Sequence, residues 1–399
     1  MSAWHRFLCR LLRWLYYNRL TILHGDRLPA SGPVVYLGLH RNGAVDGFVY
    51  ASVLPRATFM ISTQLRKSLL GKLFFSGIEV VRGKDEGDRE ANFQALARCR
   101  DLLKEGGELF ILPEGTSTLG PRHLPFKSGG ARVILDALEH RVPLTVIPLG
   151  IRYECAWSFR SNVEIIVGPP VPTETTPGLD PRGRLRELSR RIEAALEEVG
   201  VNVESADYQE SIETLAYVST LATNRSYFRS LKSLEKSVPE SVSAEWESLR
   251  SDLRKGRMFT HQRVPLVPMR FPWLYGIALA ALGPMVLVAG LVNGVPLLGG
   301  YLAGRILPDD TNVIALWRIL VGFPLFVAWV LALGLLAVLF SIPWAFGLYV
   351  LATLLGLWSY YRVRKLLVAV GNFLFHPGLR SRLLAFRGNL LKALPDEPA

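Results

Sequence analysis

The sequence predicts an α/β domain, a mixed sheet flanked by helices, followed by a helical connector and a C-terminal α-helical transmembrane region. Short apolar runs alternate with helical patterns through the first half of the 399 residues, which is typical of a sheet covered by helices. Two long stretches, 271–304 and 319–361, contain no charged residue. A membrane helix needs roughly 20 apolar residues, so these stretches predict an integral membrane protein.

Residues 1–24 predict an amphipathic helix that lies in the membrane interface. Its arginines, Arg6, Arg10 and Arg13, are placed opposite an apolar face. That face comprises Trp4, Phe7, Leu8, Leu11, Trp14 and Leu15. The alternative is a helix that packs on the core of the following domain. No uncharged run here is long enough for the core of a cleavable signal peptide.

The α/β domain is expected over residues 25–205. Its strands are predicted at 34–37, 78–81, 109–112, 144–149 and 163–167. Helices are predicted at 88–104, before two glycines that end the helix, and at 129–140. Sheets of this class bind ligands where their strands end, and two of these strands end in polar motifs. The candidate site is therefore expected at the strand ends.

A helical connector is expected over 206–268, transmembrane helices over 269–365 and a basic cytoplasmic tail over 366–399. Basic residues occur on both flanks of the apolar region, and the positive-inside tendency places both flanks in the cytoplasm. An even number of crossings is then required. Three spans are clear, so the shorter apolar piece 295–307 is expected to cross or re-enter, and four crossings are favoured.

The charge balance narrows the class of partner. Lys and Arg number 46 against 34 Asp and Glu, a formal net charge of +12. Such a charge fits nucleic acid, an anionic membrane or an acidic ligand, and the apolar stretches favour the membrane, with no nucleic acid expected. The cysteines, Cys9, Cys99 and Cys155, form no metal-ligand pattern, so a reducing compartment and no metal site are expected.

A histidine and an aspartate follow the first predicted strand, in the segment His-Arg-Asn-Gly-Ala-Val-Asp at 40–46. An imidazole with a nearby carboxylate has the parts of a general base and of the group that orients it, although such a pair alone is more often structural. On one continuous helix the two side chains would point about 120° apart. His40 and Asp46 can meet if a loop leads into a helix, and Asn42 and Gly43 supply such a turn.

A second motif follows the predicted strand at 109–112. Leu-Pro-Glu-Gly-Thr, residues 112–116, forms a tight polar turn of the kind that holds an anion. Arg82 follows another predicted strand, and Lys127 follows this turn; solvated surface charge is one interpretation of both. Together the motifs indicate acyl transfer to a hydroxyl on a substrate that carries phosphate.

Four blocks in order resemble the glycerophospholipid acyltransferase (PlsC-like) family, which includes glycerol-3-phosphate and lysophosphatidic acid acyltransferases. The resemblance covers about residues 25–171. Its blocks are His40–Asp46, Gly77–Arg82, Leu112–Ser117 with Pro125–Gly129 after it, and Val142–Pro148. The resemblance implies an α/β acyltransferase domain, catalytic roles for His40 and Asp46, and substrate binding by Arg82, Glu114, Gly115, Thr116 and Lys127.

The first block departs from the family in its spacing. Most members have four residues between the histidine and the aspartate, and this chain has five. The longer spacing resembles a branch of membrane-anchored glycerol-3-phosphate acyltransferases with apolar C-terminal segments. A degenerate site is the alternative, and the intact segments around Glu114 and Lys127 argue against it.

The resemblance implies that a fatty acyl group moves from an acyl thioester to the hydroxyl of glycerol-3-phosphate or lysophosphatidic acid in phospholipid biosynthesis. Acyl-CoA or acyl-carrier protein would be the donor, membrane lipid a partner, and no bound cofactor is required. The protein is expected in the cytoplasmic (inner) membrane, with its catalytic domain facing the cytoplasm. Open alternatives are another lysolipid as acceptor, a non-catalytic membrane scaffold that retains the fold, and a transporter, which the uncharged apolar stretches disfavour.

Overall fold

The computed structural model describes residues 2–81, 89–256 and 258–395, which divide into two compact units. The first unit comprises the chain up to Trp157 together with Val163–Asn202 and Asp309–Leu316. The second comprises Ser158–Asn162, Val203–Pro308 and the chain from Trp317 onward. The sheet and both sequence motifs belong to the first unit; because catalysis is expected there from the sequence, it is called the catalytic unit below.

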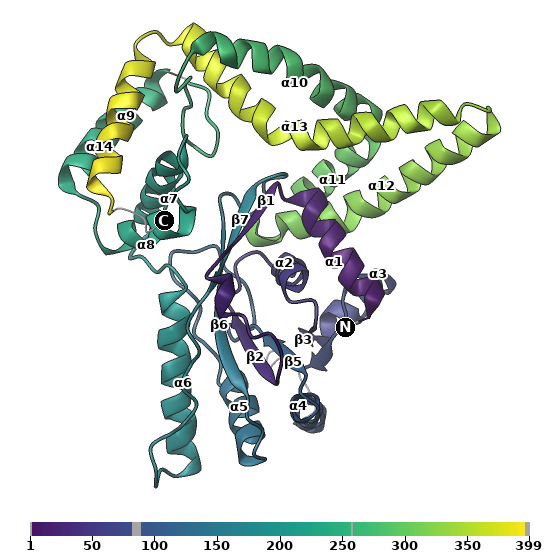
Figure 1. Ribbon diagram of the computed structural model, residues 1–399, viewed down its shortest axis with the longest axis vertical. Helices are drawn as coiled ribbons and strands as arrows, with labels where there is room; N and C mark the ends of the chain where they lie inside the picture. Colours follow the sequence, from purple (N-terminus) through teal and green to yellow (C-terminus); the bar gives the residue numbers. More distant parts are fainter. Residues whose placement is uncertain (1, 82–88, 257, 396–399) are drawn as a thin grey trace. The chain divides into compact units, whose positions relative to one another are not determined.

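The catalytic unit is built on a seven-stranded sheet within the described residues (Figure 1). Its strands are β1 (Arg19–Leu23), β2 (Val34–Gly38), β3 (Ala57–Ser62), β4 (Ile78–Val80), β5 (Glu108–Ile111), β6 (Thr145–Tyr153) and β7 (Asn162–Val167). Their order is β1-β7-β6-β2-β5-β3-β4. The strands from β6 to β4 pair in parallel, and β7 pairs antiparallel with β6, which confirms the predicted mixed sheet.

The five predicted strands all occur, as β4, β2, β5, β6 and β7. The central strands β2 and β5 are wholly buried, and a strand that is buried on both faces has an apolar run in its sequence. Strands β1 and β3 were not predicted. Both are only partly buried, so their sequences lack a continuous apolar run.

Helices flank the sheet on the ribbon diagram (Figure 1). Those of the catalytic unit are α1 (Ala3–Tyr16), α2 (Val45–Val53), α3 (Leu69–Phe74), α4 (Arg89–Lys104), α5 (Gly129–Glu139) and α6 (Pro181–Glu198). Helix α1 packs against α2, and α4 packs against α5, which also contacts α6. Helices α4 and α5 agree with the two helices predicted at 88–104 and 129–140.

The N-terminal segment differs from the single interfacial helix expected over residues 1–24. Helix α1 ends at Tyr16, and Arg19–Leu23 is a strand of the sheet instead. Leu8, which was assigned to the membrane-facing side, is buried together with Leu12. The apolar face is therefore divided: one stripe packs on the core, and the other keeps exposed Trp4, Phe7 and Trp14.

The second unit is helical. Its helices are α7 (Ala206–Thr220), α8 (Tyr227–Lys236), α9 (Glu240–Gly256), α10 (Pro272–Val292), α11 (Gly294–Ile306), α13 (Pro343–Phe375), α14 (Leu379–Ala393) and most of α12 (Ile314–Leu339). Helix α10 packs along α13. Helix α14 packs against α7 and α9, where Phe386 stacks on Trp246. The segment expected as a basic tail is therefore largely helical and partly packed.

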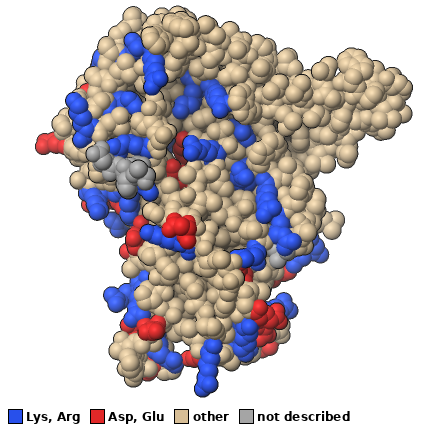
Figure 2. Space-filling view, viewed as in Figure 1, with Lys and Arg blue, Asp and Glu red and all other residues tan. Residues whose placement is uncertain are grey.

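Three helices in the described part of the chain are long and apolar enough to cross a membrane: Pro272–Val292, Thr311–Leu339 and Pro343–Phe375. Helix α11 has 13 residues, about 20 Å of helix, whereas the hydrocarbon core of a bilayer is about 30 Å thick. Helix α11 is therefore shorter than a straight crossing of the core, and the number of crossings stays a prediction. Figure 2 shows the outer surface of the apolar helices as an area without charged side chains.

Candidate active site

Two neighbouring parallel strands place the two motif loops at one edge of the sheet. Strand β2 ends at Gly38, two residues before His40, and strand β5 ends at Ile111, three residues before Glu114. In the sheet Leu37 pairs with Ile111. Because parallel strands end at the same edge, the loops that follow them emerge side by side.

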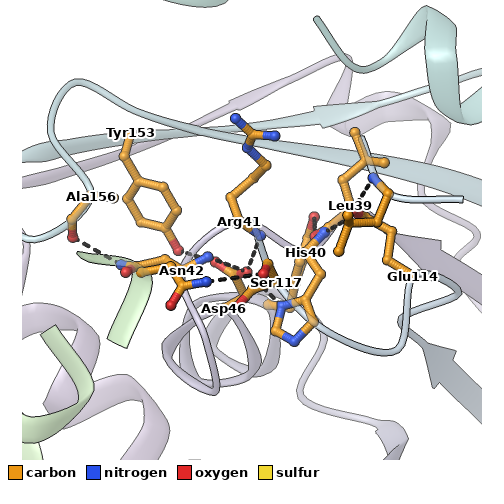
Figure 3. Close-up of polar contacts among 12 residues, drawn as sticks. Leu39, His40, Arg41, Asn42, Asp46, Glu114, Ser117, Tyr153 and Ala156 are labelled. Atoms are coloured by element: carbon orange, nitrogen blue, oxygen red, sulfur yellow. Dashed lines mark hydrogen bonds and ion pairs between the residues drawn. The ribbon is translucent and has the colours of Figure 1, made fainter. Parts of the chain in front are cut away.

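The first loop brings His40 and Asp46 together. The Nδ1 atom of His40 lies 2.9 Å from Oδ2 of Asp46, and the Asp46 side chain is fully buried. Gly43 makes the required turn in the left-handed region, at φ +54°, and Asp46 lies in the first turn of α2. This is the predicted loop-to-helix geometry. It leaves Nε2 of His40 pointing away from Asp46 (Figure 3).

Asp46 accepts four hydrogen bonds from the surrounding chain (Figure 3). Its Oδ2 atom accepts from the backbone N–H of Arg41 at 2.6 Å and of Asn42 at 2.8 Å, besides the His40 contact. Its Oδ1 atom accepts from the hydroxyl of Tyr153 at 2.6 Å. A buried carboxylate with this many donors is held in one orientation, and it fixes the Nδ1–H tautomer of His40.

Tyr153 was missed in the sequence because it lies far from Asp46 along the chain, at the end of strand β6. Burial, followed by the nearby Asp46 charge, raises the pKa of its phenol well above the usual range, so the hydroxyl stays a donor. Asn42 adds a second anchor: its amide donates to the Tyr17 hydroxyl and to the carbonyl of Ala156, each at 2.8 Å. These contacts fasten the loop to β6 and to the end of α1.

Glu114 links the second loop to the first through the main chain. Its Oε1 atom accepts from the backbone N–H of His40 at 2.8 Å, and its Oε2 atom accepts from that of Leu124 at 3.1 Å. The side chain is 1% exposed. Burial raises the pKa of its carboxyl, and the two N–H bonds oppose that shift. The resemblance implies substrate binding by Glu114, whereas its hydrogen bonds among the described residues go to backbone N–H groups.

Gly115, Thr116 and Lys127 form the outer part of the same turn. Gly115 has φ +70°, and a Cβ there would lie 2.7 Å from Nζ of Lys127, so the glycine leaves room for the ammonium group to cross the turn. The Lys127 backbone N–H donates to the carbonyl of Pro113 at 2.9 Å. Thr116 and Lys127 are exposed. Arg82 lies outside the described residues, so its predicted role stays a prediction.

The side chains of this region are of the kinds that transfer protons and bind anions. Within residues 2–81, 89–256 and 258–395, no group of three or more His, Cys, Asp or Glu side chains is arranged to hold a metal ion. The described groups are an oriented imidazole, two buried carboxylates, and an exposed ammonium group beside a glycine turn. That arrangement can remove a proton from a hydroxyl next to a bound anion.

Residues 20–152 match the family model described as Acyltransferase. A 1-acyl-sn-glycerol-3-phosphate acyltransferase from Chlamydomonas reinhardtii is 27% identical over 136 residues, which are 34% of this chain and 40% of that protein. The human 1-acyl-sn-glycerol-3-phosphate acyltransferase alpha is 26% identical over 179 residues, 43% of this chain and 60% of that protein. The chain thus covers 40% to 60% of the length of these relatives.

Among solved structures, the 1-acyl-sn-glycerophosphate acyltransferase PlsC from Thermotoga maritima is similar, with a TM-score of 0.35 and 16% sequence identity. The match covers 49% of this chain and 77% of that structure. The family model falls on the part of the chain that contains His40, Asp46 and Glu114. Over residues 20–152, therefore, this chain is similar to the Acyltransferase family model, and both sequence relatives are named 1-acyl-sn-glycerol-3-phosphate acyltransferases.

Proposed function

We propose that this chain is a membrane-bound O-acyltransferase that moves a fatty acyl group from an acyl thioester to the hydroxyl of a phosphorylated glycerol. The observation that carries the proposal is the His40–Asp46 pair, held beside the Glu114 turn within the segment that matches the family model. Because the sequence relatives are named 1-acyl-sn-glycerol-3-phosphate acyltransferases, lysophosphatidic acid is the favoured acceptor. Glycerol-3-phosphate and other lysolipids are the alternatives.

His40 is the proposed general base. With Nδ1–H donated to Asp46, the free Nε2 atom takes the proton from the acceptor hydroxyl as its oxygen attacks the thioester carbonyl. Asp46 stabilises the imidazolium that results. When the tetrahedral intermediate collapses, the C–S bond breaks, an ester forms, and the imidazolium returns the proton to the departing thiolate. Acyl-CoA and acyl-carrier protein are both possible donors, and the thioester is already activated, so no bound cofactor is needed.

The negative charges of the reaction need donors. Backbone N–H groups of the loops at the strand ends are the proposed donors for the oxyanion that forms at the carbonyl. Lys127, whose ammonium group lies over Gly115, is proposed to bind the acceptor phosphate together with Arg82 and Thr116. Glu114 supports this binding by bracing the backbone of His40 and Leu124 rather than by touching phosphate.

We place the catalytic unit on the cytoplasmic face of the inner membrane, because basic residues flank the apolar region on both sides. With both flanks on one face, the number of crossings must be even, and that number stays a prediction.

The test is acyl transfer from labelled acyl-CoA by detergent-purified protein, with wild type beside His40→Ala. Lysophosphatidic acid and glycerol-3-phosphate are offered separately, and acyl-carrier protein serves as a second donor. We expect transfer to one acceptor in the wild type and a loss of roughly 10²- to 10⁴-fold in the variant, the range for removal of a general base. Circular dichroism of both proteins controls for folding.

A folded wild type that acylates neither acceptor with either donor would contradict the proposal and favour a membrane scaffold that retained the fold. Transfer that survives in His40→Ala would show instead that another group removes the proton.

A further inference from the structure

A short segment from the C-terminal half of the chain belongs to the catalytic unit. Asp309–Leu316 clusters with that unit, although the helices before and after it, α11 and most of α12, belong to the second. Residues Thr311–Val313 form one 3₁₀ turn within it. The apolar region is therefore interrupted by a segment that the family model does not cover and that the proposed function does not use.

This segment contacts both motif loops. The side-chain amide of Asn312 donates to the backbone carbonyl of Ser117 at 2.9 Å, directly after the turn that contains Thr116. The carbonyl of Asn312 lies over Gly43 in the other loop, where a Cβ would be 3.0 Å away. Asn312 is 6% exposed. The contact is part-buried, so loss of the donor would leave the Ser117 carbonyl without this partner.

The contact at Gly43 coincides with the unusual feature of the first motif. Gly43 is one of the five residues between His40 and Asp46, and its positive φ is open to glycine at little cost. A larger residue there would meet both Asn312 and Val313. The longer loop and the inserted segment therefore fit each other, which is an explanation of the spacing that does not invoke a degenerate site.

We propose that Asn312 is a positioning residue of the acyltransferase site, and that Asp309–Leu316 is one of its walls. By its hydrogen bond to the Ser117 carbonyl, Asn312 fixes the position of the turn from Glu114 to Ser117 relative to the His40 loop. The residue after Ser117, Thr118, donates its backbone N–H to the His40 carbonyl at 3.2 Å. The inference rests on the proposed function in assigning this turn to the acceptor phosphate.

The first experiment compares steady-state kinetics of wild type, Asn312→Ala and Asn312→Asp. Loss of one part-buried hydrogen bond that positions a binding turn is expected to raise KM for the phosphorylated acceptor roughly five- to tenfold, while kcat changes less than about threefold. The aspartate variant, which sets a carboxylate against the Ser117 carbonyl, should have the larger effect. Asn389→Ala is the matched control, because it removes an exposed side-chain amide that bonds to Glu245 in the second unit.

The second experiment measures hydrogen exchange by mass spectrometry in the same full-length proteins, and it needs no activity. Exchange is expected to become faster in peptides that contain Thr118 and Gly43 in both Asn312 variants, and to stay unchanged in Asn389→Ala. If Asn312→Asp unfolds the whole catalytic unit, the comparison rests on Asn312→Ala, which is the milder change.

The two readouts separate the inference from the proposed function. Unchanged exchange and an unchanged KM in both Asn312 variants would overturn the positioning role. A KM that stays constant while kcat falls would also contradict it. If exchange is faster in the Asn312 variants but the wild type transfers no acyl group, the positioning role is supported and the acyltransferase proposal is rejected.

Discussion

The loops after β2 and β5 each bury one carboxylate, and the two carboxylates differ in what they contact. Asp46 is fully buried and bonds to an imidazole, a phenol and two backbone N–H groups. Glu114 is buried to the same degree, and its described hydrogen bonds go to two backbone N–H groups. The same chemical group therefore orients the proposed general base in one loop and braces the main chain in the other.

Burial alone does not distinguish the two groups. Removing a carboxylate from water costs free energy in either loop, and hydrogen bonds must offset that cost. What distinguishes them is the 2.9 Å contact between Asp46 and the His40 ring. A buried acid is thus evidence for catalysis only when its partner is a group that can move a proton.

The sharpest test of this contrast pairs Asp46→Asn with Glu114→Gln. The asparagine amide no longer fixes the Nδ1–H tautomer of His40 or stabilises the imidazolium, so kcat should fall about 10³- to 10⁴-fold. Glu114→Gln keeps one acceptor for a backbone N–H and should lower kcat no more than about tenfold. Acyl-transfer assays on folded protein measure both. Equal losses in the two variants would remove the distinction between the loops.

Tyr153→Phe tests whether the hydrogen bond from the Tyr153 hydroxyl to Asp46 affects catalysis, apart from the packing of the ring. The change removes one hydrogen bond to a charged group, so kcat should fall roughly tenfold. Tyr50→Phe is the matched control, because Tyr50 is equally buried and its hydroxyl donates to the carbonyls of Leu39 and Leu149. That control should lose stability and keep most of its kcat. Similar kinetic losses in both variants would assign Tyr153 a packing role.

Lys127→Ala examines the outer side of the Glu114 turn. An exposed ammonium group interacts with an anion through water, so KM for the phosphorylated acceptor should rise only about two- to fivefold. The effect should shrink further at high salt, because exposed charges are screened. Arg132→Ala, an exposed basic residue on α5, is the control for net charge. An equal rise of KM in that control would indicate general electrostatic attraction rather than a bound phosphate.

The smallest expected effect is on the pH dependence of stability. Burial raises the pKa of Glu114 above 4.5, so the folded protein holds this proton more tightly than the unfolded chain does. The favourable contribution is complete below pH 4.5 and is lost as the pH rises through the folded pKa. Relative to Glu114→Gln, wild type should therefore lose thermal stability over that range. Thermal unfolding at several pH values would detect it, and parallel curves would contradict it.

The sequence determined those features that depend on near neighbours. His40 and Asp46 are six positions apart, and the Asn42–Gly43 turn between them fixes how they meet. Buried strands β2 and β5 are visible as apolar runs, and the long helices are visible because a span must be apolar along its whole length. Each of these signals is contained in a window of a few to about thirty residues.

The tertiary structure decided the contacts that join distant parts of the chain. Glu114 bonds to the backbone of His40 across 74 positions, Tyr153 bonds to Asp46 across 107, and Asn312 bonds to Ser117 across 195. The partly exposed strands β1 and β3, and the early end of α1, follow from the same cause. The register of parallel strands and the docking of a remote segment depend on packing between elements, and no local window of sequence contains that information.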